Sequence, residues 1–122
     1  MQRSLPNPTV GDVWYAVLGP TTGREQTGFR PVIVVSNDSF NRLENSLVYV
    51  VPVTSRDRRY DLHVPIAAGN GGLPRECVAM CDQMRSVDIS RLKKHQGVLN
   101  ADTLASICHI ISLILIDEPG VY

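Results

Sequence analysis

Two short runs of β-branched residues constrain the fold of this chain more than any other feature. The first extends from Arg30 to Ser36 (RPVIVVS) and the second from Leu47 to Val53 (LVYVVPV). Residues of this kind favour β-strands, and turn-forming residues bound both runs. Further strands are predicted at 13–18, 62–66 and 76–81, and Pro65 indicates that the run 62–66 lies at a sheet edge.

One long helix is predicted over residues 101–116, and a short helical turn over 37–42. Asn100 is a suitable N-cap for the long helix, and Asp102 lies near its positive end. The last turns of this helix are apolar on nearly all sides. Such a helix is covered on more than one side. The apolar last turns could be covered by a second subunit or by deep packing within a single chain.

Short strands, an edge proline and one terminal helix predict a mainly β fold with a C-terminal α-helix. The expected form is a small SH3-like antiparallel barrel or half-barrel. The chain of 122 residues is expected to form a single domain, 1–122. Within it we expect a loose lead-in at 1–10, a β-barrel at 11–99 and the helix at 100–116.

Charge and cysteine content restrict the class of protein. The formal net charge is zero, which argues against binding to nucleic acid through bulk charge alone. Cys77 and Cys81 on one strand would lie roughly 13 Å apart, too far for a disulfide. We expect these two and Cys108 to be reduced and buried, in a cytoplasmic protein. The N-terminus lacks the apolar core of a signal peptide, and the apolar run 110–116 is too short to span a bilayer.

Arg30 is a fixed cation at the start of a strand that is otherwise Val and Ile. A polar loop of eleven residues, 19–29, leads into it, and loops of this length often carry function. Pro31 stiffens the backbone and biases Arg30 towards an extended conformation. A guanidinium mounted in this way suits bidentate contact with a phosphate. The alternative is a solvated arginine at a strand entry.

Several motifs occur in a characteristic order: GDVW at 11–14, GREQ at 23–26, GFRPV at 28–32, VPVTS at 51–55 and CDQMRS at 81–86. Together with the closing helix, they resemble the MazF/PemK/Kid family of toxin endoribonucleases from type II toxin–antitoxin systems. The resemblance extends from about residue 10 to residue 116. It implies a PemK/CcdB-like fold and a cytoplasmic homodimer. It also implies metal-independent, sequence-selective cleavage of single-stranded RNA without a cofactor, giving a 2′,3′-cyclic phosphate and a 5′-hydroxyl.

The resemblance places the catalytic arginine on Arg30 and the catalytic threonine on Thr54. It also implies a cognate antitoxin that occupies the RNA groove, and contact with operator DNA only through the antitoxin complex. Without the resemblance, Thr54 would be assigned to strand packing, because threonine is a favourable strand residue. Candidate supporting or RNA-binding residues are Arg24, Glu25, Gln26, Phe29, Arg56, Arg58, Asp82, Gln83 and Arg85. For the loop residues the alternative is solvation, and for Asp82 it is turn formation.

The chain departs from one branch of the family at two positions. That branch has a histidine where this chain has Arg24, and an arginine where it has Met80, so the general base is left open. We expect His63 and His95 at the surface, His109 packed in the helix and Trp14 in the core. No cluster of His, Cys and carboxylates has metal-ligand spacing, so no metal is expected.

Two other functions remain open on the same scaffold. One is a CcdB-type gyrase poison, although the tail DEPGVY at 117–122 lacks the tryptophan typical of such poisons. The other is a non-catalytic protein that binds only antitoxin or operator complexes. The Arg30 and Thr54 motifs favour the endoribonuclease over both.

Overall fold

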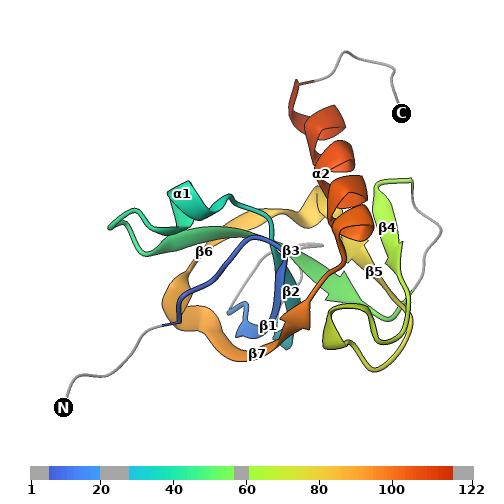
Figure 1. Ribbon diagram of the computed structural model, residues 1–122, viewed down its shortest axis with the longest axis horizontal. Coiled ribbons are helices and arrows are strands. Elements are labelled where there is room, and N and C mark those ends of the chain that lie inside the picture. Colours follow the sequence, from blue (N-terminus) through green and yellow to red (C-terminus); the bar gives the residue numbers. More distant parts are fainter. Residues whose placement is uncertain (1–5, 20–27, 57–60, 117–122) are drawn as a thin grey trace.

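The computed structural model describes residues 6–19, 28–56 and 61–116. A curled antiparallel sheet carries one long helix against it (Figure 1). The strands are β1 (Asp12–Val17), β2 (Phe29–Val34), β3 (Leu47–Thr54), β4 (His63–Ile66), β5 (Cys77–Met80), β6 (Arg85–Asp88) and β7 (Leu92–Val98). The α-helices are α1 (Asp38–Asn41) and α2 (Ala101–Ile116), and the 3₁₀ turns are η1 (Asn70–Gly72), η2 (Cys81–Gln83) and η3 (Ile89–Arg91).

The main path through the sheet runs β4-β5-β3-β2-β1-β7. Strand β3 pairs with β2 along one side. Along its other side it pairs with β6 through Leu47–Val50 and with β5 through Val53 and Thr54. The predicted mainly β fold with a C-terminal helix is therefore confirmed. The sheet is a half-barrel, because no pairing in the described residues joins β4 to β7, and β4 lies at the expected edge.

Strands β2 and β3 are buried on both faces. Val32 and Val34 pack into one hydrophobic cluster, together with Val50 of β3. Ile33 and Val51, the alternate residues, pack into a second cluster that includes Ile107 of α2. Side chains of a strand alternate between its faces, so a strand between two cores reads as a continuous apolar run. This double burial explains the two runs that dominate the sequence.

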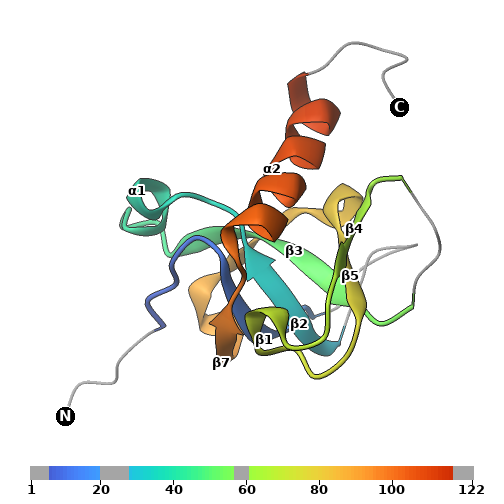
Figure 2. The ribbon, with the colours of Figure 1, turned by 45° about the vertical axis from the view of Figure 1, so that its right-hand side comes forward.

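Helix α2 begins as the sequence predicts. The Asn100 side chain accepts a hydrogen bond from the backbone N–H of Thr103, at 2.9 Å. Only Ile107 of this helix is fully buried, whereas Leu115 and Ile116 are 62% and 82% exposed. Figures 1 and 2 show the first turns against the sheet and the last turns extending beyond it. No helix among the described residues has both the length and the apolar character needed to cross a membrane.

Two strands were not predicted from the sequence. In β6 only Val87 is buried, so the alternation that would identify a strand is too short to detect. Strand β7 carries Lys93 and Lys94 and pairs with β1 through two register shifts. Each shift interrupts the period-two pattern on which the prediction depends. The remaining predicted strands appear within one or two residues of their expected ends, including β2, which ends at Val34 and not at Ser36.

Candidate active site

A cavity of about 650 Å³ opens where the start of β2 meets the end of β3. Its walls come from four separate segments of the chain, which the sheet topology brings together. The lining residues are Tyr15, Arg30, Pro31, Val53, Thr54, Ser55, Arg56, Leu73, Pro74, Arg75 and Cys77. The cavity therefore contains both predicted catalytic residues, Arg30 and Thr54, and the predicted RNA-binding residue Arg56.

Arg30 extends from β2 towards the end of β3. Its Nη1 donates a hydrogen bond to the backbone carbonyl of Val53, at 3.5 Å. The side chain is partly buried, and this burial lowers the pKa of the guanidinium below its usual value. Arginine keeps its charge in proteins even so. A cation partly removed from water interacts more strongly with a phosphate than an exposed one.

Thr54 is the last residue of β3 and is half-buried. Its side-chain oxygen Oγ1 accepts a hydrogen bond from the backbone N–H of Arg56, at 3.2 Å. This contact fixes the hydroxyl and turns the chain, so that Arg56 also faces the cavity. Because the oxygen is the acceptor here, the hydroxyl proton can be donated to a bound anion.

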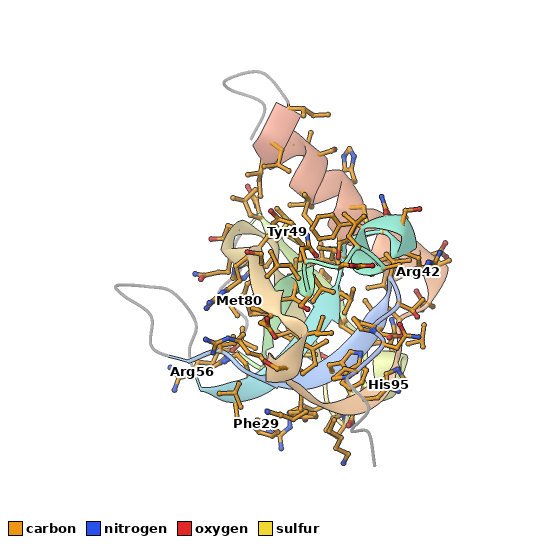
Figure 3. The ribbon with its side chains drawn as sticks, turned by 90° about the vertical axis from the view of Figure 1, so that its left-hand side faces the viewer. Phe29, Arg42, Tyr49, Arg56, Met80 and His95 are labelled. Atoms are coloured by element: carbon orange, nitrogen blue, oxygen red, sulfur yellow. The ribbon has the colours of Figure 1, made fainter. Side chains whose placement is uncertain are left out.

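An aromatic pair adjoins the cavity. Phe29, at the start of β2, stacks on Tyr15 with ring centroids 5.4 Å apart and planes inclined by 24°. Tyr15 lines the cavity, and Phe29 is 61% exposed. Figure 3 shows Phe29 and Arg56 on the same side of the molecule, opposite Arg42. An exposed ring beside a cationic cavity offers a face on which a nucleobase can stack.

Four of the predicted supporting residues do not line this cavity: Phe29, which adjoins it, and Asp82, Gln83 and Arg85. Asp82 and Gln83 lie in η2, where Asp82 Oδ1 is 3.5 Å from Nε2 of His63. Arg85 lies in β6 and donates from Nη1 to the backbone carbonyl of Leu18, at 3.2 Å. The other predicted supporting residues, Arg24, Glu25, Gln26 and Arg58, are outside the described residues.

Several expectations about histidine and cysteine are wrong. His63 is not a surface residue, since only 8% of its side chain is exposed beside Asp82. His109 and Cys108 of α2 are exposed, contrary to expectation. Cys77 and Cys81 are buried and free, as expected, and burial and the nearby Asp82 raise the pKa of Cys81 to about 12.

Two residues of the cavity were missed in the sequence, Arg75 and Tyr15. Arg75 follows GGLP at 71–74, which we interpreted only as a turn. Tyr15 was assigned to a strand with no site role. The sequence gives no signal that these two residues lie near Arg30. Their proximity depends on the pairing of β1 with β2 and of β3 with β5. Within residues 6–19, 28–56 and 61–116, no three His, Cys, Asp or Glu side chains gather to hold a metal ion.

The fold is therefore a half-barrel with a C-terminal helix. The candidate site is a cationic cavity at one end of the sheet. Residues 9–115 match the family of PemK-like, MazF-like toxins of type II toxin–antitoxin systems. The chain belongs to this family, as the motifs predict.

Individual relatives agree with this assignment. The chain is 36% identical over 108 residues to the endoribonuclease MazF9 of Mycobacterium tuberculosis, covering 84% of this chain and 92% of the relative. A crystal structure of MazF from Deinococcus radiodurans superposes with a TM-score of 0.79 at 31% identity, covering 90% and 97% of the two chains. A MazE–MazF complex from the same organism gives 0.73 at 28% identity, covering 90% and 96%.

Proposed function

We propose that this protein is a toxin endoribonuclease that cleaves single-stranded RNA without a metal ion. The observation that supports this most directly is the shared cavity of Arg30, Thr54 and Arg56. Family membership and relatives named as endoribonucleases agree with it. The products are a 2′,3′-cyclic phosphate and a 5′-hydroxyl, formed by attack of the ribose 2′-hydroxyl on the adjacent phosphate.

The chemistry requires a group that stabilises negative charge on phosphorus. During attack, charge increases on the non-bridging oxygens, and the Arg30 guanidinium binds them through parallel hydrogen bonds. The Thr54 hydroxyl donates a hydrogen bond to the same phosphate. The stacked Phe29 and Tyr15 hold a flanking base. Asp82 does not line this cavity, so we do not assign it as the general base.

We also propose the partners that this activity requires. A cognate antitoxin inhibits the toxin by occupying the cationic cavity, and operator DNA is contacted only through that complex. The MazE–MazF structure of a relative supports an antitoxin of this kind. A homodimer is supported by the exposed apolar end of α2. A cytoplasmic location is supported by three free thiols, which suit a reducing compartment.

The decisive experiment is cleavage of mixed RNA in EDTA, followed by mapping of the 5′ ends. Purified protein is expected to cut at a restricted set of sequences and to leave 5′-hydroxyl termini. The same preparation is tested in a gyrase supercoiling assay. Inhibition of gyrase with intact RNA would replace the proposal with a CcdB-type poison, and inactivity in both assays would favour a non-catalytic binding protein.

Substitution of Arg30 tests the assigned residue separately. Arg30→Ala is expected to lower cleavage by at least about 10³-fold, because the charged transition state loses its main ligand. The melting temperature should change little, since the Arg30 side chain is only partly buried and its hydrogen bond to the end of β3 is long. Arg42→Ala, an exposed arginine on the far side of the molecule, is the matched control and should keep full activity. Full activity of Arg30→Ala would refute the assignment.

A further inference from the structure

The cavity contains a third guanidinium, which neither the motifs nor the catalytic assignment includes. Arg75 lines it together with Arg30 and Arg56. The three arginines come from three segments: the start of β2, the residues after β3, and the turn before β5. No carboxylate is among the lining residues in the part of the chain that the structure describes. Glu76, the neighbour of Arg75, lines the adjacent hollow instead.

The backbone that carries Arg75 is rigidly anchored. Leu73, two residues earlier, is 2% exposed within the core, and Cys77, two residues later, is buried at the start of β5. The preceding turn is tied to β7, where the Gln96 side chain donates to the carbonyl of Gly72, at 2.7 Å. Gly69 N–H donates to the carbonyl of Leu73, at 2.7 Å. Arg75 therefore extends from a fixed point, as Arg30 does.

Three cations around one cavity have a specific chemical consequence. Like charges repel, and a ligand with a single charged group can neutralise only one or two of them. A chain of phosphates places an anion beside each arginine in turn and removes the repulsion. Only one of these phosphates is cleaved. The remaining cations are then available to bind the phosphates next to it.

We propose that Arg75 binds a phosphate flanking the scissile one and fixes the register of the RNA in the cavity. This inference rests on the proposed endoribonuclease activity and adds a subsite to it. Arg75 acts on substrate binding and positioning, whereas Arg30 acts on the reacting phosphate. Loss of Arg75 should therefore raise KM and leave kcat nearly unchanged.

The test compares Arg75→Gln with the control Arg42→Gln, which removes the same charge from an exposed position on the far side. Steady-state cleavage of a short RNA is measured between low and moderate salt. For Arg75→Gln we expect a KM about tenfold higher and a kcat within about threefold of wild type. The slope of log(kcat/KM) against log[salt] should fall in magnitude by about 0.7, the value for one lost phosphate contact on a single strand. Arg75→Lys should recover most of the slope.

A second measurement identifies the phosphate. Single neutral methylphosphonates replace, in turn, each phosphate within two nucleotides of the cleavage site. One replacement should raise the wild-type KM about tenfold and have almost no further effect on Arg75→Gln, because both changes remove the same contact. Equal and additive effects at every position would overturn the proposal, and so would unchanged KM and salt slope in Arg75→Gln.

The two proposals fail in different ways. If wild-type protein cuts no RNA, the proposed function itself is wrong. If wild type cuts RNA and Arg75→Gln behaves like Arg42→Gln, only the flanking-phosphate subsite is wrong. Melting curves of both variants exclude a folding defect, which is not expected because both arginines are exposed.

Discussion

At the scale of single residues, the cavity depends on small backbone contacts that orient charged or polar side chains. Arg30 is directed to the end of β3 by the carbonyl of Val53, and the hydroxyl of Thr54 is fixed by the N–H of Arg56. Each contact links a candidate catalytic group to a strand end. A preorganised group of this kind needs little rearrangement during the reaction.

Thr54 provides a prediction at this scale. Thr54→Val keeps the shape of the side chain but removes its hydroxyl, so kcat is expected to fall by about 10²–10³-fold. Thr54→Ser keeps the hydroxyl and should stay within about tenfold of wild type. Single-turnover cleavage at saturating enzyme measures both rates. Equal activity of the Val and Ser variants would show that Thr54 only packs in the strand.

At the scale of elements, the contact between η1 and β7 holds the turn that precedes Arg75. Gly72 has φ of +75°, and a Cβ atom there would lie 2.2 Å from the backbone oxygen of Gln96. A Cβ at Gly97 would lie 2.6 Å from the oxygen of Gly71. The two backbones therefore approach each other at a distance that only glycine permits.

This close approach gives a prediction for stability. Gly72→Ala is expected to lower the free energy of unfolding by about 3 kcal/mol, from left-handed backbone strain and a clash that the backbone cannot avoid. Gly69→Ala is the control, because its φ is +89° but no atom lies within 4 Å of the added Cβ. Gly69→Ala should cost about 1 kcal/mol, from the left-handed backbone alone. Urea denaturation measures both values, and equal costs would show that the η1–β7 contact is not tightly packed.

At the scale of the whole molecule, the end of α2 is incompletely covered. A hollow between the helix and the sheet is lined by Val35, Ser36, Tyr49, Met84, Cys108, Ile111 and Leu115. Leu115 and Ile116 are mostly exposed. An apolar surface of this kind is typical of an interaction site. We expect a second copy of the chain to cover it in solution.

Dimerisation can be tested on opposite faces of the same helix. Leu115→Lys should convert a dimer of about twice 13.5 kDa into a monomer, since the charge would be buried at the interface. Ser106→Lys is the control, because Ser106 is exposed about 180° around the helix from Leu115. Light scattering at micromolar concentration measures the mass. A wild-type monomer, or a dimer of Leu115→Lys, would contradict the prediction.

Particular elements show where sequence-based prediction succeeds and fails in this protein. Helix α2 and the turn α1 were predicted because Asn100 and Asn37 cap them locally. Strands β2 and β3 were predicted because both of their faces are buried. Strand β7 was missed because its bulged pairing with β1 leaves no alternation to detect.

The amino-acid sequence by itself determined the class of elements, the family and the candidates Arg30 and Thr54, because these depend on local patterns and ordered motifs. The tertiary structure decided that Arg75 and Tyr15 join them, and that Asp82 and Arg85 do not line the cavity. The physical reason is that the cavity walls come from strands whose paired residues lie 12 to 26 positions apart in the sequence. Pairing of that range depends on the packing of the whole sheet, which local propensity does not encode.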